Sequence, residues 1–164
     1  MGRITRRDAL SISTGTAIAN CVSWPTSANA ANPTEQKGAS TMDIQRIGIT
    51  EAIGDIPIIS LASIHDNIVY LCGITADPVR LGDVKEQTKQ ILDRVDRLLE
   101  RAGTNKSKLL TAQVWLTDMG LFADHNSVWN GWVDAKNPPV RMCVHSHQLW
   151  RPGLLVEIMM TAAK

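Results

Sequence analysis

The sequence predicts a two-layer α+β domain, in which one β-sheet carries two helices on one of its faces. Short runs of β-branched and large apolar residues recur along the chain, and turn-forming residues bound them. Two longer segments repeat their apolar residues with the 3.6-residue period of an amphipathic helix. Strands and helices that alternate around one sheet give a two-layer domain, and 164 residues are enough for one such domain.

Three strands are predicted in the first half of the domain. They cover residues 44–49, 58–64 and 68–74, each of which is a short apolar run. The turn formers His65-Asp66-Asn67 separate the second run from the third, so these two strands should form a hairpin. A loop over residues 75–82 follows the hairpin.

Two helices follow in the predicted order, with one strand between them. Asp83 is expected to cap the first helix, which runs to about Arg101, and Gly103 is expected to end it. The second helix lies within residues 118–135, and Pro138-Pro139 stops it because proline cannot continue a helix.

Three further strands bring the predicted sheet to about six. They cover residues 109–117, 140–147 and 154–160. The strands are apolar on both of their sides, whereas the helices are expected to cover only one face. The other face must also be buried, and oligomerisation is the natural way to bury it.

The last two strands carry an arginine and a glutamate in unusual settings. Alternation places Arg141 on the same strand face as Cys143, and Glu157 lies inside an apolar run where an unpaired charge is costly. A guanidinium can hold a carboxylate through two parallel hydrogen bonds. Two interpretations are open: Arg141 and Glu157 pair with each other inside the sheet, or Arg141 belongs to a site for a small carboxylate.

Composition excludes several classes of protein. The formal net charge is +1, which does not suggest a protein that binds nucleic acid or a membrane surface. The sequence has no phosphate-binding loop, no dinucleotide fingerprint and no Cys-x-x-Cys metal motif. Its cysteines, Cys21, Cys72 and Cys143, form no disulfide framework.

The first thirty residues are typical of an export signal. The pair Arg6-Arg7 precedes a weakly apolar run, and Ala28-Asn29-Ala30 fits a signal-peptidase site, as in twin-arginine signals. We therefore expect a signal peptide over residues 1–30, a linker over 31–41, a domain over 42–164 and a periplasmic protein. The alternative is that translation begins at Met42, which would leave the protein in the cytoplasm.

Residues from Met42 onward resemble the RidA (YjgF) family of reactive intermediate deaminases, especially its YoaB-like branch. The strand Pro139 to Val144, with its Arg-x-Cys pattern, and the downstream Val156-Glu157-Ile158 carry the most specific part of the resemblance. Further matches are Gly73, Gln87-Thr88, Ala102-Gly103, Asn105-Lys106-Ser107, Phe122-Ala123 and Asn126. The resemblance implies a chorismate mutase-like fold and a homotrimer with a central barrel and three sites at the subunit clefts.

The resemblance also implies a reaction, the hydrolysis of 2-imino acids or their enamine tautomers to 2-oxo acids and ammonia. In that reaction Arg141 would hold the substrate carboxylate, while the backbone carbonyl of Cys143 and the carboxyl of Glu157 would position the water and handle protons. Gly73 would allow close approach of the backbone, and Asn126 would lie near the site. No cofactor is implied.

Two features near this site concern specificity. Trp150 follows the Arg141 strand and is expected to shape the entrance for substrate. Many family members carry a site tyrosine whose place falls near Ile59, where this sequence has none. The histidines His145 and His147 share a strand face, but two histidines alone predict no metal site.

Three alternatives to this function remain from the sequence. The protein could be a non-catalytic module that senses a small carboxylate through Arg141. It could be a deaminase dedicated to an aminomuconate-like acid in one pathway. It could also be a ribonuclease or translation inhibitor, a label attached to this family, although the near-neutral charge argues against that.

Overall fold

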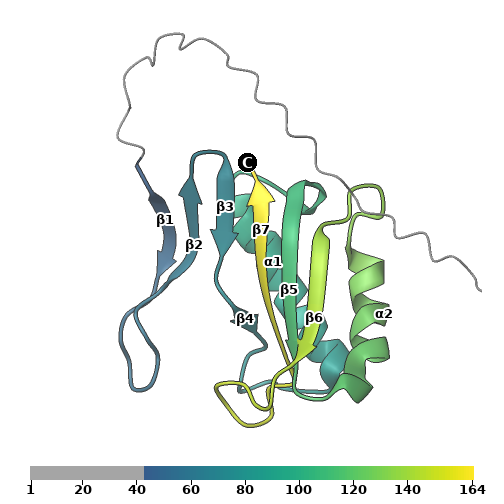
Figure 1. Ribbon diagram of the computed structural model, residues 1–164. Coiled ribbons are helices and arrows are strands. Elements are labelled where there is room, and N and C mark those ends of the chain that lie inside the picture. The colour runs from purple at the N-terminus through teal and green to yellow at the C-terminus, as the bar shows by residue number, and fades with distance from the viewer. Residues whose placement is uncertain (1–42) are drawn as a thin grey trace, which may run out of the picture. The chain divides into compact units, whose positions relative to one another are not determined.

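The computed structural model describes residues 43–164, which fold into one sheet with two helices (Figure 1). The expected signal peptide and linker therefore lie outside the described residues. No helix within the described part is both long and apolar enough to cross a membrane.

The sheet has seven strands, one more than the sequence predicts. Its order is β1-β2-β3-β7-β5-β6, and the short β4 pairs with β7. Only the β5–β6 pair is parallel. The strands are β1 (Gln45–Ile49), β2 (Ser60–His65), β3 (Ile68–Leu71), β4 (Ile74–Thr75), β5 (Leu109–Leu116), β6 (Val140–His145) and β7 (Val156–Ala163).

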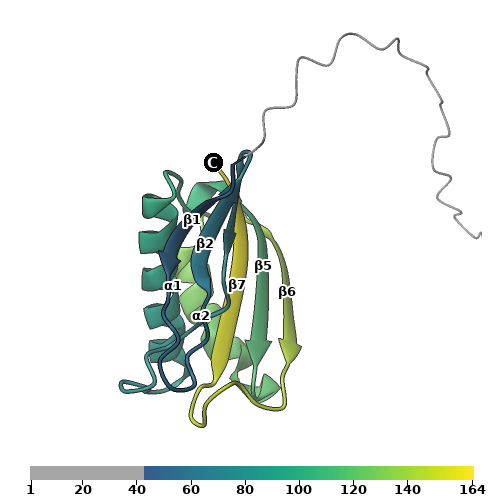
Figure 2. The same cartoon turned by 90° about the vertical axis from the view of Figure 1, so that its left-hand side faces the viewer.

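Helices α1 (Val84–Arg101) and α2 (Phe122–Trp132) both lie on one face of the sheet (Figure 2). The predicted cap is confirmed, because the Asp83 side chain accepts a hydrogen bond from the amide of Glu86 at 2.9 Å. Gly103 follows the helix with a φ of +77°, a conformation that glycine adopts without strain. Two short 3₁₀ turns, Lys106–Lys108 and Met119–Leu121, precede β5 and α2 respectively.

Alternate residues of β5 and β7 build the core beneath the helices. On β7, Val156, Ile158, Met160 and Ala162 are buried, and the residues between them are only half-buried. These side chains pack against the apolar stripe of α1, which includes the fully buried Ile91. The hydrophobic periodicity of the sequence thus selects which face of each element points inward.

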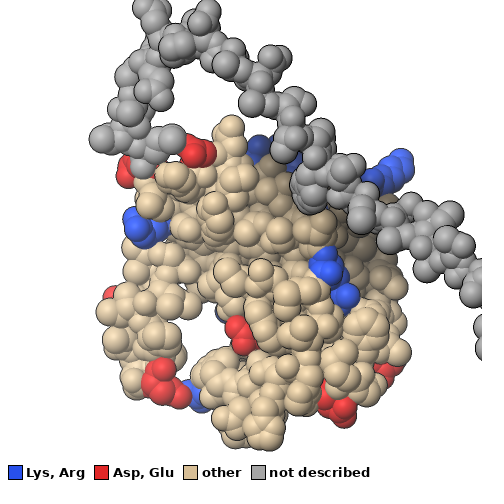
Figure 3. All heavy atoms as spheres, in the orientation of Figure 1, with Lys and Arg blue, Asp and Glu red and all other residues tan. Residues whose placement is uncertain are grey.

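The opposite face of the sheet has no helix over it among the described residues. Tyr70 on β3 and Met142 and Val144 on β6 are large apolar side chains that remain exposed there. Figure 3 views this face, most of which is uncharged, with a few acidic and basic groups inside its outline as well as at its edge. An apolar surface of this kind is typical of an interface between protein chains.

Several strand boundaries differ from the prediction. β2 begins at Ser60 rather than residue 58, and β6 ends at His145, so His147 lies outside the strand and does not share its face with His145. The apolar run 68–74 is divided, because the chain leaves β3 after Leu71 and then pairs Ile74 and Thr75 with β7. The last strand begins at Val156 rather than Leu154 and continues to Ala163, since the turn over residues 151–153 keeps Leu154 and Leu155 out of the ladder.

Candidate functional site

Arg141 lies on β6 with its side chain on the helix-covered face of the sheet. Its Nη2 donates a hydrogen bond to Oδ1 of Asn126 at 3.0 Å, and its guanidinium lies 4.9 Å from the centre of the Trp129 ring. Both partners belong to α2, one turn apart. Burial lowers the pKa of the Arg141 guanidinium, and no carboxylate among residues 43–164 forms an ion pair with it. Because its partners are neutral, the positive charge of this partly buried arginine is not neutralised and can attract an anion.

Cys143 lies two residues after Arg141 on β6, with its thiol on the same face of the sheet. Burial raises the pKa of the thiol, and the neighbouring Arg141 charge opposes that rise. The thiol is therefore mostly protonated at neutral pH, which does not suit a nucleophile. We call Arg141, Cys143, Asn126 and Trp129 the Arg141 group.

The backbone of Cys143 faces the free edge of the sheet. The amide of Ser146 donates to the carbonyl of Leu116 on β5 at 2.8 Å. Successive residues of a strand direct their amide and carbonyl groups to alternate sides, so the odd-numbered residues of β6, including Cys143, direct theirs away from β5. Strand β6 is the last in the sheet, so these groups have no strand partner among the described residues.

Glu157 lies on β7 and forms a second cluster with Gly73, Thr75 and Trp150, which we call the Glu157 group. Thr75 is the ladder partner of Glu157, and its hydroxyl accepts a hydrogen bond from Nε1 of Trp150 at 3.2 Å. The Glu157 carboxylate occupies the space where a side chain at Gly73 would begin. Burial raises the pKa of the Glu157 carboxyl above its usual value, because the charged form is partly removed from water.

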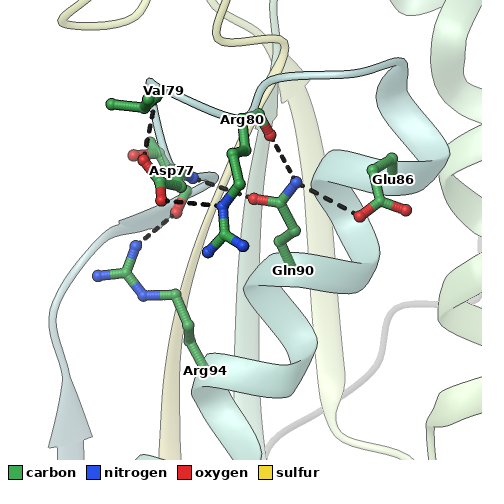
Figure 4. A network of polar contacts seen from close by, with 7 residues as sticks. Asp77, Val79, Arg80, Glu86, Gln90 and Arg94 are labelled. Atoms are coloured by element: carbon green, nitrogen blue, oxygen red, sulfur yellow. Dashed lines mark hydrogen bonds and ion pairs between the residues drawn. The ribbon is translucent and has the colours of Figure 1, made fainter.

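A polar network joins β4 and the loop that follows it to α1 (Figure 4). Arg94 of α1 donates a hydrogen bond to the Thr75 carbonyl at 3.0 Å. The side-chain oxygen of Gln90 accepts a hydrogen bond from the Asp77 amide at 3.2 Å. Gln90 also donates to the carbonyl of Arg80 at 2.7 Å. These bonds tie the loop after β4 to α1, so the position of Thr75 beside Glu157 is set by the helix.

The loop that carries Trp150 is tied to the same helix. The buried Gln87 donates to the Gly153 carbonyl at 2.9 Å and accepts from the Leu155 amide at 2.9 Å. Both bonds satisfy backbone groups that would otherwise be unpaired in a loop. Trp150 itself remains half exposed, as an entrance residue would be.

The structure does not bring the two groups together within one chain. Arg141 aligns with Ala112 of β5, and Ala112 aligns with Met160 of β7, so these three side chains share the helix-covered face. Glu157 is three residues from Met160 and therefore lies on the opposite face. The interpretation in which Arg141 and Glu157 pair inside one sheet does not describe this structure.

Three residues near the site were not assigned to it from the sequence: Thr75, His125 and Trp129. Trp129 is buried, as a core aromatic would be, and it also stacks on Arg141. His125 and Trp129 are four residues apart on α2, a spacing that places them on one helix face with Asn126 beside them. His145 and His147 are exposed, and no group of three possible metal ligands occurs among the described residues.

The fold and the two groups together define a two-layer α+β protein with a candidate site for a small carboxylate. The chain belongs to the family described as Endoribonuclease L-PSP, whose sequence model matches residues 57–164. Its relatives are named as RutC family proteins, and solved structures of similar chains are named as YjgF family members. The family predicted from the sequence is thereby confirmed.

Individual relatives cover most of the domain. A RutC family protein of Haemophilus influenzae is 38% identical over 121 residues, which span 74% of this chain and 98% of the relative. The RutC family protein YoaB of Escherichia coli is 41% identical over 101 residues, 61% of this chain and 85% of the relative. The crystal structure of NMB1025, a YjgF family protein from Neisseria meningitidis, has 36% identity and a TM-score of 0.68, and covers 75% of this chain and 96% of its own.

Proposed function

We propose that this protein is a cofactor-independent hydrolase that converts reactive 2-imino acids, or their enamine tautomers, into 2-oxo acids and ammonia. The observation that carries the proposal is the setting of Arg141. Its guanidinium is desolvated, stacked on Trp129 and bonded to the neutral Asn126, and it has no acidic partner among the described residues. Such an arginine is suited to hold the carboxylate of an imino acid through two hydrogen bonds.

The chemistry then needs a water molecule and a proton carrier. With the carboxylate on Arg141, the C=N carbon would lie next to the Cys143 carbonyl, which is directed toward the free edge of β6 and can accept a hydrogen bond from water. Attack of that water forms the new C–O bond and, with protonation of the nitrogen, gives a carbinolamine. Transfer of the hydroxyl proton to the nitrogen then breaks the C–N bond, which leaves the 2-oxo acid and releases ammonia. Glu157 is suited to carry these protons, because burial raises the pKa of its carboxyl.

A complete site requires two copies of the chain in this proposal. The Arg141 group lies on the helix-covered side of the sheet at the β6 edge, and the Glu157 group lies on the other face. Assembly through the apolar open face would place the Glu157 group of one subunit against the β6 edge of the next. A homotrimer with its open sheet faces around a central barrel has this arrangement, with one site in each subunit cleft.

The surface of the molecule argues against the activity named in the family description. A ribonuclease must bind a chain of phosphates, which proteins do with a stripe of lysine and arginine. The formal net charge is only +1, and few basic side chains lie on the open face (Figure 3). A carboxylate sensor without turnover could also bind its ligand through Arg141. Such a sensor would not need a carboxyl group with a raised pKa, such as that of Glu157.

A coupled assay tests the proposal directly. An amino-acid oxidase generates imino acids, and semicarbazide traps those that remain before they hydrolyse. The purified protein should lower the amount of trapped product in proportion to its concentration, and the Arg141→Ala variant at equal concentration should not. Equal trapping with and without the unaltered protein, across a panel of amino-acid side chains, would reject the proposal.

A further inference from the structure

His125 is a buried titratable residue to which the proposed mechanism assigns no role. It lies on α2 between Asn126, its neighbour in sequence, and Trp129, one turn further on. Its side chain has no solvent exposure, and its Nδ1 atom lies 2.9 Å from the hydroxyl of Thr88 on α1. The Nε2 atom is buried without a hydrogen-bond partner among the described residues.

The contacts of Thr88 determine which nitrogen of His125 carries the proton. The Thr88 hydroxyl lies 2.7 Å from the carbonyl of Val84, and a carbonyl can only accept, so the single hydroxyl proton is used there. Toward His125 the hydroxyl oxygen must then accept, and Nδ1 must be the donor. Burial lowers the pKa of His125 to about 4, so the ring is neutral at pH 7. The remaining nitrogen, Nε2, is consequently an acceptor with a free lone pair.

Arg141 supplies the complementary donor. Its Nε–H is also buried without a partner among the described residues, although its Nη2 is bound to Asn126. The Arg141 charge acts on His125 and contributes to the fall in the pKa of that ring. Asn126 and Trp129 of α2 both contact the guanidinium, and His125 precedes Asn126 on the same helix. Buried polar groups of opposite hydrogen-bonding character in one place are normally paired, directly or through an ordered water.

We propose that His125 is a positioning residue for Arg141, through one buried water that donates to Nε2 of His125 and accepts the Nε–H of the guanidinium. Arg141 has five N–H donors, of which His125 would then hold one and Asn126 another. The remaining donors, on Nη1 and Nη2, would be left at the outer end of the guanidinium for the substrate carboxylate. This inference rests on the proposed function only in the identity of that last ligand.

The first test needs no enzyme activity. Nitrogen-15 NMR of the histidine rings should show Nδ1 of His125 protonated and Nε2 unprotonated in the unaltered protein at pH 7. In the Arg141→Ala variant, the Nε2 signal should move while the Nδ1 signal, which reports the Thr88 contact, stays in place. A protonated Nε2, or an Nε2 signal that does not shift in the Arg141→Ala variant, would overturn the proposal.

The second test uses two replacements of His125 that resemble different halves of the ring. The amide of His125→Asn can replace Nδ1 at Thr88 but cannot reach the bridging water, whereas the carbonyl of His125→Gln can reach the position of Nε2. Binding of 2-oxobutanoate, a 2-oxo acid of the product class, should weaken about tenfold in the Asn variant, as expected for one lost hydrogen bond to a charged group. The Gln variant should remain within about threefold of the unaltered protein.

The outcomes separate the two proposals. If neither variant changes 2-oxobutanoate binding relative to the unaltered protein, or if both weaken it equally, His125 does not position Arg141. If the unaltered protein binds no 2-oxo acid at all, the proposed function fails, and the NMR response of His125 to Arg141→Ala still decides the inference by itself.

Discussion

Arg141 and Glu157 lie on opposite faces of one sheet, on strands β6 and β7 that flank β5. The first belongs to a group of residues beneath α2, and the second to a group formed with β4 and the Trp150 loop. Neither group contains both a carboxylate-binding cation and a proton carrier. The proposed hydrolysis needs both groups, and the sheet separates them within one chain.

Subunit mixing should restore activity if each site joins two chains. Arg141→Ala and Glu157→Gln homotrimers should each be inactive, because every site lacks one half. After joint unfolding and refolding in equal amounts, a random trimer would have about a quarter of its sites intact. The coupled assay should recover about that fraction of the unaltered activity.

A matched control for mixing is the pair Arg141→Ala and Arg141→Lys. Both variants lack a functional Arg141, so no arrangement of subunits gives an intact site. Recovery of activity in this control, or none in the first mixture when light scattering shows mixed trimers, would contradict a shared site.

Replacement of Arg141 should affect activity much more than stability. Arg141→Ala is expected to lose about 2–5 kcal/mol of transition-state binding, the range measured when one partner of a buried charged contact is removed. Arg141→Lys should be nearly as damaging, because an ammonium cannot hold both carboxylate oxygens in one plane. Since Arg141 has no ion-pair partner among the described residues, removing it leaves no buried acid behind.

The measurement is the melting temperature of each Arg141 variant beside its turnover. Melting temperatures within a few degrees of the unaltered protein, together with lost turnover, are expected. Turnover that falls only in step with the folded fraction would show that Arg141 has a structural role instead.

Gly73→Ala should disturb the Glu157 group selectively. An added methyl would enter the space that the Glu157 carboxylate occupies, so the carboxylate must move. We expect turnover to fall by about tenfold or more, because small displacements of a reacting group are costly. The control is Gly131→Ala on α2, where an added methyl meets no atom within 4 Å and favours the helix. Equal activity of the two variants would argue against a catalytic role for Glu157.

His125 should make stability depend on pH below neutrality. Its pKa is about 4 in the folded protein and near 6.5 when exposed, so the unfolded chain binds more protons between these values. The free energy of unfolding should therefore fall as the pH is lowered from 6.5 toward 4, by up to about 3 kcal/mol per subunit. Denaturant unfolding of the unaltered protein and of His125→Asn at pH 7 and pH 4.5 measures this. The same acid sensitivity in both would assign it to other groups.

The leader remains a prediction from residues outside the described part of the chain. If Arg6-Arg7 belongs to a twin-arginine signal, replacing both with lysine should leave a precursor in the cytoplasm. Cell fractionation with an antibody to the domain measures this. Absence of an exported form of the unaltered protein would instead favour Met42 as the start.

Local patterns in the sequence were sufficient for most of the elements. Helix α1 was predicted to within a residue, because its apolar stripe, the Asp83 cap and Gly103 all agree. The division of the run 68–74 could not be predicted in this way. All of its residues suit a strand, and the break at Cys72 and Gly73 arises because the pairing of β3 and β4 with β7 is interrupted there.

The site was predicted as a set of residues but not as an arrangement. Strand alternation correctly placed Arg141 and Cys143 on one face. It could not relate Arg141 to Glu157, because their relative orientation depends on both strands pairing with β5, and strand order is a long-range property. The contact of Trp129 with Arg141 depends in the same way on how α2 packs against the sheet.

The central position of β7 also bears on how the chain folds during synthesis. Among the described strands β7 comes last in chain order, yet it lies between β3 and β5 and is the only one of them that joins β1-β2-β3 to β5-β6. A growing chain on the ribosome can form the β2–β3 hairpin and the β5-α2-β6 unit early, but it cannot join them before Val156–Ala163 have been made. Until then, both pieces expose unpaired strand edges, and nascent chains that stop short of β7 should be targets for chaperones and proteases.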